Sequence, residues 1–132
     1  MDLTIDSIAS ISKTITEQDV HSFAELSGDF NPVHVDKDEA KKSIFKKQIA
    51  HGMLVGSLIS SVIGMKLPGP GTIYMEQNFT FLKPVYLGDT VTAYVEVDEV
   101  INKKKGIYRL KTYVKKQDDS VVIDGYAVVK YQ

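Results

Sequence analysis

Hydrophobic and polar residues follow two patterns along the chain, and the first gives way to the second at about residue 71. Before this point, apolar residues recur mostly at helical spacing. After it, segments rich in β-branched and aromatic residues are separated by turn residues, which is typical of strands. We predict four long strands at 72–82, 90–100, 107–114 and 121–131, and one earlier strand at 11–16.

The predicted strand at 90–100 shows the clearest alternation. Its apolar positions are Val91, Ala93, Val95 and Val97, and the residues between them are Thr92, Tyr94, Glu96 and Asp98. Side chains point to opposite faces along a strand, so one face of this strand is predicted to meet water.

Two helices are predicted between the first strand and residue 50. The first begins at Thr16, which can act as the N-cap with acidic residues in the following turn, and it ends at Gly28. Its apolar stripe is Val20, Phe23, Ala24 and Leu26. Asp36 is predicted to cap a second, short helix through residues 39–41.

A third helix is predicted at 53–65, and its apolar residues cover nearly the whole circumference. Such a helix must be buried on all sides. We therefore predict an α+β fold in which an antiparallel sheet, its last four strands paired as a meander, wraps around this central helix. A sheet of so few strands covers only part of a helix, which favours a homodimer.

Composition limits the classes of protein to consider. The chain has 132 residues, of which 43% are hydrophobic and 25% charged, and this favours one globular domain over 1–132. The net charge of −1 does not favour nucleic-acid binding, and the absence of cysteine excludes disulfides and thiolate chemistry. No signal peptide or membrane span is predicted, so we expect a cytoplasmic protein.

The segment 28–34 carries the candidate chemistry. Asp29 and His34 lie five positions apart, and Asn31 and Pro32 between them favour a stiff turn. A carboxylate and an imidazole on one rigid loop can hold a single water molecule. This arrangement suits the addition or removal of water.

Several segments together resemble the MaoC-like (R)-specific enoyl-CoA hydratases, also called the hydratase 2 family. The resemblance lies in 23–34 with Ala40, then in 49–54, 67–71, 81–85 and 88–89. It implies a hot-dog fold and a dimer whose sheets join edge to edge. It also implies reversible syn hydration of trans-2-enoyl-CoA thioesters to (R)-3-hydroxyacyl-CoA, a step of fatty acid metabolism, with no metal or redox cofactor.

The resemblance implies that Asp29 and His34 are the catalytic pair. We expect Asp29 to act as the base toward water and His34 to share that water and relay the proton. Asn31 is expected to orient the loop. Gly52 stands at the predicted start of the long helix, where a free backbone N–H and the helix dipole can stabilise the thioester oxygen.

By the same resemblance, Ser60, Ile63 and Val128 are expected to line the acyl pocket, and the size of the last two favours short chains such as crotonyl. Their alternative role is simple packing against the sheet. Lys83 and the lysines at 103–105 could meet CoA phosphates. We interpret His51 as structural support, and a metal held by Asp29, His34 and His51 is a less favoured alternative.

Three other functions are alternatives. The same chemistry could act on a carrier protein, as in a 3-hydroxyacyl-ACP dehydratase. A non-catalytic acyl-CoA-binding module would leave the Asp29–His34 pair unexplained. A thioesterase of this fold is disfavoured, because such enzymes place their acid elsewhere.

Overall fold

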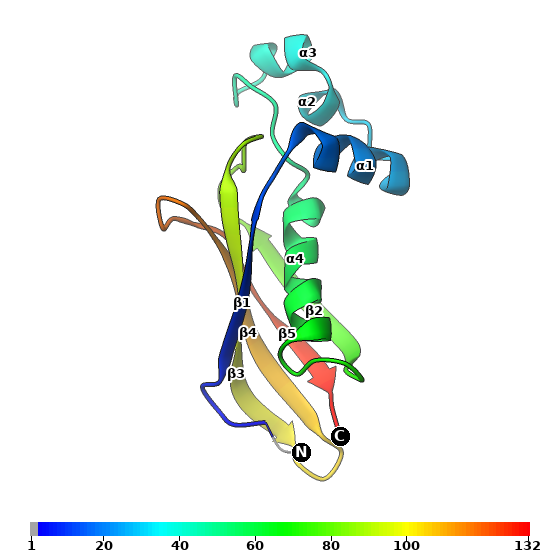
Figure 1. Cartoon of the computed structure of the whole chain (residues 1–132), viewed down its shortest axis with the longest axis vertical. Coiled ribbons are helices and arrows are strands. Elements are labelled where there is room, and N and C mark those ends of the chain that lie inside the picture. The colour runs from blue at the N-terminus through cyan, green and yellow to red at the C-terminus, as the bar shows by residue number, and fades with distance from the viewer. Residues whose placement is uncertain (1–2) are drawn as a thin grey trace.

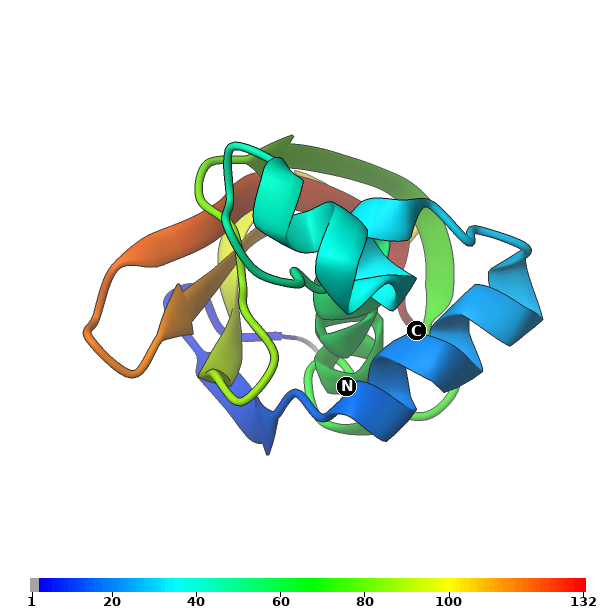
Figure 2. The ribbon, with the colours of Figure 1, turned by 90° about the horizontal axis from the view of Figure 1, so that it is seen from above.

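The computed structural model describes residues 3–132 and shows a curved sheet around one long helix (Figures 1 and 2). The elements, in chain order, are β1 (Ile8–Thr14), α1 (Glu17–Ser27), α2 (Pro32–Val35), α3 (Lys37–Lys42), α4 (Gly52–Met65), β2 (Ile73–Phe81), β3 (Thr90–Asn102), β4 (Ile107–Lys116) and β5 (Val121–Lys130). This arrangement confirms the predicted α+β hot-dog architecture with α4 as the central helix.

The sheet has the order β1-β3-β4-β5-β2, and every neighbouring pair is antiparallel. The last three strands form the predicted meander, but the prediction that β2 would begin it is wrong. β1 occupies the free side of β3, with Ile8 opposite Glu96. The remaining edge belongs to β5, and β2 pairs there, with Phe81 opposite Ile123.

The first strand lies three residues earlier at its start than predicted and ends two residues sooner. The N–H of Ile15 donates to the Asp89 carbonyl, outside the β1–β3 ladder, at 2.9 Å. Thr16 then serves as the N-cap of α1. The chain therefore leaves the sheet before the predicted end of the strand.

The predicted caps are confirmed. The Thr16 hydroxyl accepts the Asp19 N–H at 3.1 Å while the Asp19 carboxylate accepts the Thr16 N–H at 2.9 Å, which is a capping box. Gly28 ends α1 in the left-handed region, with φ 81°. Asp36 caps α3, because its carboxylate accepts the N–H groups of Asp38 and Glu39, the second and third residues of the helix. The place predicted for Leu26 is wrong, because α1 turns Val20 and Ala24 inward and leaves Leu26 86% exposed.

The core lies between α4 and the sheet. The alternation predicted for β3 is confirmed, since its four inward residues, Val91, Ala93, Val95 and Val97, are fully buried. Residues of α4 pack on this face, namely Val55, Leu58, Ile59, Val62 and Ile63.

The prediction that the long helix is buried on all sides is wrong for the single chain. The sheet covers one side of α4, and Met53, Ser57, Ser60 and Ser61 remain exposed on the other. Among residues 3–132, no helix combines the length and apolarity needed to cross a membrane.

Candidate active site

A cavity of about 410 Å³ lies at the N-terminal end of α4. Three segments that are distant in the sequence converge there: the loop after α1, the stretch that leads into α4, and the loop after β2. The lining residues are Asp29, His34, Phe45, Ile49, Ala50, His51, Gly52, Met53, Val55, Phe81, Leu82, Lys83, Pro84, Val85 and Ile123. The structure thus brings Asp29, His34 and Gly52 together as the sequence predicted.

Short-range hydrogen bonds fix the loop that carries Asp29. The Ser27 hydroxyl accepts the Asp29 N–H at 3.1 Å, and the Asp29 carboxylate accepts the Asn31 N–H at 3.1 Å. Asn31 is the N-cap of α2, and its side chain accepts the Val33 N–H at 3.3 Å. This contact agrees with the loop-orienting role predicted for Asn31. Asp29 itself stays exposed and can contact a molecule in the cavity.

His34 lies on α2 and is only 9% exposed. Its Nδ1 is 2.7 Å from the Ile49 carbonyl, which can only accept, so Nδ1 carries the proton and Nε2 is left as an acceptor. Burial lowers the pKa of His34, and this outweighs the opposite effects of the Ile49 carbonyl and of Asp29. The neutral imidazole is therefore favoured at neutral pH, with its bare nitrogen available to a proton.

His51 contacts both the loop that carries Asp29 and the ring of His34. Its side chain is 2% exposed, and its Nε2–H donates to the Asp29 carbonyl at 3.0 Å. Its ring stacks on that of His34, with centroids 4.0 Å apart, and tilts against Phe23 at 4.8 Å. These contacts agree with the interpretation of His51 as structural support.

The side chains of Asp29, His34 and His51 could be read as a metal site, because one ligand atom of each lies within 4.8 Å of the others. The bare nitrogens are Nε2 of His34 and Nδ1 of His51. A metal must lie near the plane of each ligating ring at about 2.1 Å from its nitrogen. Two rings stacked 4.0 Å apart with an interplanar angle of 29° lie in nearly parallel planes that do not meet close to both nitrogens, so this pair is poorly arranged to share one ion.

Gly52 is the first residue of α4, and His51 before it makes no side-chain cap. The first N–H groups of a helix lack intrahelical partners, and the positive end of the helix dipole lies there. A Cβ atom at Gly52 would lie 2.6 Å from Cε1 of Phe81. Glycine therefore lets the Phe81 ring and the helix start share one wall of the cavity.

The three residues predicted to line the acyl pocket do not reach this cavity within one chain. Ser60 lies in a second hollow of about 440 Å³ between α4 and β2, which shares Met53 with the first. Ile63 is 1% exposed in the core, and Val128 lies on β5 between two buried residues that point the other way. Their role in binding an acyl chain stays a prediction.

The two groups of lysines predicted near CoA phosphates lie far apart. Lys83 lines the cavity. The lysines at 103–105 lie in the turn between β3 and β4, which is at the opposite end of the molecule from α2 and α3 (Figure 1). The single chain therefore does not support a contact between 103–105 and a molecule in its own cavity.

Sequence reasoning missed two features of the site. One is the apolar wall, which includes Phe45, Leu82 and Pro84. The 81–85 segment carries part of the family resemblance and indicates part of this wall. The other is the Ile49 carbonyl that fixes the His34 proton, and a backbone acceptor 15 residues away leaves no trace in the residue pattern.

Comparison with known proteins gives consistent matches. Residues 6–118 match the family described as MaoC like domain. The chain is 48% identical over 122 residues to the (R)-specific enoyl-CoA hydratase of Rhodospirillum rubrum, covering 92% of this chain and 83% of that protein. It is 40% identical over 129 residues to the 3-hydroxybutyryl-CoA dehydratase of Methylorubrum extorquens, covering 98% and 81%. The solved (R)-hydratase from A. caviae involved in PHA biosynthesis matches with a TM-score of 0.95 at 42% identity, covering 98% of each chain.

Proposed function

The chain belongs to the MaoC-like domain family, and on this premise we propose that it is an (R)-specific enoyl-CoA hydratase. The reaction is the reversible syn addition of water to a trans-2-enoyl-CoA, which gives the (R)-3-hydroxyacyl-CoA. The relatives described above are hydro-lyases by name, and they match this chain over most of its length. The names hydratase and dehydratase describe opposite directions of one reversible reaction, and both directions use the same site.

The observation that carries this proposal is the accessible Asp29 carboxylate beside the bare Nε2 of His34 in one cavity. Both groups accept hydrogen bonds, so a water between them can direct its oxygen at carbon 3 of the substrate. In the proposed step, Asp29 removes one proton from the water as the oxygen bonds to carbon 3. The proton passes to Nε2 of His34 and then to carbon 2, and the second proton of the water stays on the product hydroxyl.

The electron pair of the double bond moves onto the thioester oxygen as the new bond forms. This oxygen then needs a hydrogen-bond donor in a dry wall of the cavity. The Gly52 N–H at the start of α4 suits this role, and one such donor is worth about 3 kcal/mol in other enzymes. The chemistry then needs no metal or redox cofactor, since the thioester already polarises the double bond.

We also infer a homodimer. β2 has a single neighbour in the described sheet, and three apolar residues near its open edge are more than half exposed, namely Met53, Ile73 and Met75. An open edge with apolar side chains is a surface that proteins usually cover. A mass of twice the chain in sedimentation would support the inference, and a monomer at micromolar concentration would contradict it. The cytoplasmic location stays a prediction.

The activity is tested by mixing the purified protein with crotonyl-CoA and following the loss of the enoyl absorbance, with chiral analysis of the product. The proposal expects hydration to the (R)-alcohol. A crotonyl carrier-protein thioester tested in parallel distinguishes the enoyl-CoA hydratase from the carrier-protein dehydratase. Tight binding of crotonyl-CoA with no change in absorbance would contradict the proposal and favour the non-catalytic module.

A further inference from the structure

The segment 49–52 carries two groups on which the proposed chemistry depends. The Ile49 carbonyl oxygen lies 2.7 Å from Nδ1 of His34 and thereby keeps the proton on that nitrogen. Gly52 offers its backbone N–H to the thioester oxygen. Between them lies His51, which holds the Asp29 carbonyl. A small shift of this segment would disturb both the His34 imidazole and the oxyanion donor.

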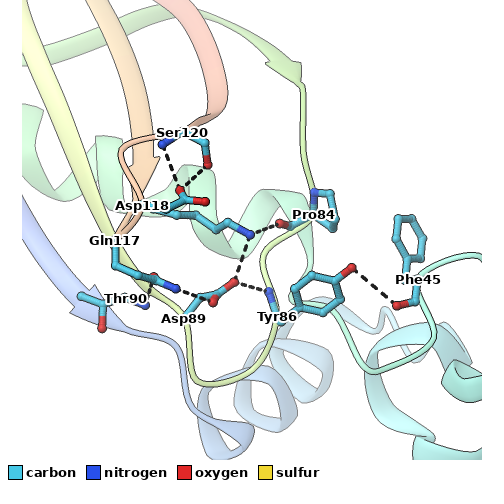
Figure 3. Close-up of polar contacts among 9 residues, drawn as sticks. Phe45, Pro84, Tyr86, Asp89, Thr90, Gln117, Asp118 and Ser120 are labelled. Atoms are coloured by element: carbon cyan, nitrogen blue, oxygen red, sulfur yellow. Dashed lines mark hydrogen bonds and ion pairs between the residues drawn. The ribbon is translucent and has the colours of Figure 1, made fainter.

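The segment is attached to the loop between β2 and β3. The Ala50 N–H donates to the Val85 carbonyl at 2.7 Å, and Ile49 forms an isolated antiparallel bridge with Tyr86. The Tyr86 hydroxyl points at the Phe45 carbonyl at 3.5 Å, a long and weak contact (Figure 3). The position of 49–52 therefore follows that of Val85 and Tyr86.

Asp89 fixes this loop in turn. Its carboxylate accepts the Tyr86 N–H at 2.8 Å and the Gln117 side-chain amide at 2.8 Å, and it pairs with Lys116 at 3.4 Å (Figure 3). Lys116 also donates to the Pro84 carbonyl at 3.2 Å. Asp89 and Lys116 together thus connect both ends of the 84–86 stretch to the end of β4 and the turn that follows it.

The surroundings of Asp89 make this attachment firm. The side chains of Asp89 and Lys116 are only 15% and 13% exposed. Burial tends to raise the pKa of Asp89, but the hydrogen bonds from Gln117 and Tyr86 and the charge of Lys116 lower it overall. The Asp89 carboxylate is therefore charged at neutral pH, and removal of Lys116 leaves this mostly buried charge without its ion-pair partner.

We infer that Asp89 is a positioning residue for the active site, acting through Tyr86 and Val85 on the segment 49–52 and thereby on His34 and Gly52. The inference rests on the proposed function. Asp89 touches neither substrate nor the reacting atoms. Its role is to keep the proton of His34 on Nδ1 and to keep the Gly52 N–H in its position at the cavity. The alternative is that Asp89 only closes a turn and contributes to stability.

The first test reads the state of His34 without any activity. The chain has 3 histidines, so ¹⁵N-histidine labelling gives a simple NMR spectrum in which the protonated ring nitrogen of His34 can be identified. Asp89→Asn keeps the shape of the side chain but removes its charge. The inference expects this variant to show a mixture of His34 tautomers and a His34 pKa closer to its ordinary value. An unchanged His34 spectrum would overturn it.

The second test is kinetic and uses crotonyl-CoA. For Asp89→Asn we expect kcat to fall roughly 10- to 100-fold, as for a displaced catalytic group, with a smaller change in KM and a shifted acid limb of the pH profile. Lys116→Met provides a second variant of the same network and is expected to act in the same direction. A fall in melting temperature with unchanged kcat and pH profile in both variants would show a purely structural role.

Asp118→Asn is the matched control. Asp118 lies in the same turn between β4 and β5, but its carboxylate is exposed and bonds only Ser120 within the described part of the chain. We expect it to leave the His34 spectrum and kcat unchanged. If the wild-type protein hydrates no thioester, the proposed function fails, while the NMR comparison still decides whether Asp89 controls His34.

Discussion

The two ends of α4 differ in almost every physical respect. At the N-terminal end, three segments meet, two buried imidazoles stack on each other, and the first residue of the helix, Gly52, lines a cavity. Toward the C-terminal end, Ile59, Val62 and Ile63 are buried in an apolar core. The comparison shows that one helix serves both purposes, because its dipole and unpaired N–H groups place chemistry at its start while its later turns stabilise the fold.

Alanine substitutions at two glycines of α4 should separate the two ends of the helix with the largest expected effect on kcat. Gly52→Ala would drive a Cβ atom against the Phe81 ring, so we expect kcat for crotonyl-CoA to fall about 10²- to 10³-fold, as when an oxyanion donor is displaced. Gly64→Ala meets nothing within 4 Å, and we expect unchanged kcat and about 0.5–1 kcal/mol of added stability. Equal effects of the two variants on kcat would contradict the comparison.

Ile63→Ala tests the buried half of α4. Removal of a side chain that is 1% exposed should lower the free energy of unfolding by about 2–5 kcal/mol, measured with urea. The kcat per folded molecule on crotonyl-CoA should change little. If Ile63 instead lines the acyl pocket, this variant should show a stronger preference for longer enoyl chains. A shifted chain preference with unchanged stability would place Ile63 in the acyl pocket instead of the core.

The pH dependence of stability should report the buried histidine at the active end. Because burial lowers the pKa of His34 below its ordinary value of 6.5, the unfolded chain takes up a proton first as the pH falls. The free energy of unfolding should therefore decrease as the pH falls through 6.5 and level off below the pKa of the folded state. Protonation of His34 in the folded protein should also reduce kcat/KM on the acid side of the pH profile. In His34→Gln this part of the stability change should be absent, and its persistence would contradict the assignment.

Two lysines at opposite ends of the molecule give the smallest expected effect. Lys83 lines the cavity and the lysine at 104 lies in the far turn. For Lys83→Gln we expect KM for crotonyl-CoA to rise up to about fivefold at low salt, which is the scale of an exposed ion pair. Lys104→Gln should leave KM unchanged. The difference should vanish at high ionic strength, and an equal rise in both variants would remove the distinction between the two ends.

The sequence predicted the parts of the fold that depend on local pattern. Alternation gave the inward face of β3, capping residues gave both ends of α1, and the apolar run gave α4. It did not predict the place of β2, because pairing with β5 depends on β1 having taken the other edge. It also misplaced Leu26, whose spacing fits a stripe that the packing of α1 does not use.

For the site, residues in one short segment were predictable and contacts between segments were not, although His34 lies on α2 and not in the stiff turn predicted for 28–34. Asp29, Asn31 and His34 lie in one short segment, and the resemblance added Gly52. The hydrogen bond from His34 to the Ile49 carbonyl and the ties of Asp89 to Tyr86 and Gln117 involve backbone groups or distant side chains. Such contacts follow from the assembled fold and leave no periodic signal.

A double-mutant cycle tests most directly the proposal that Asp29 and His34 hold one water. kcat for crotonyl-CoA would be measured for Asp29→Asn, His34→Gln and the double variant, with folding checked by circular dichroism. If both groups hold one water, each single variant should lose about 10²- to 10⁴-fold in kcat, and the double variant should be little slower than the worse single. Near-normal kcat in either single variant, or losses that multiply in the double, would contradict the claim that Asp29 and His34 act on the same water.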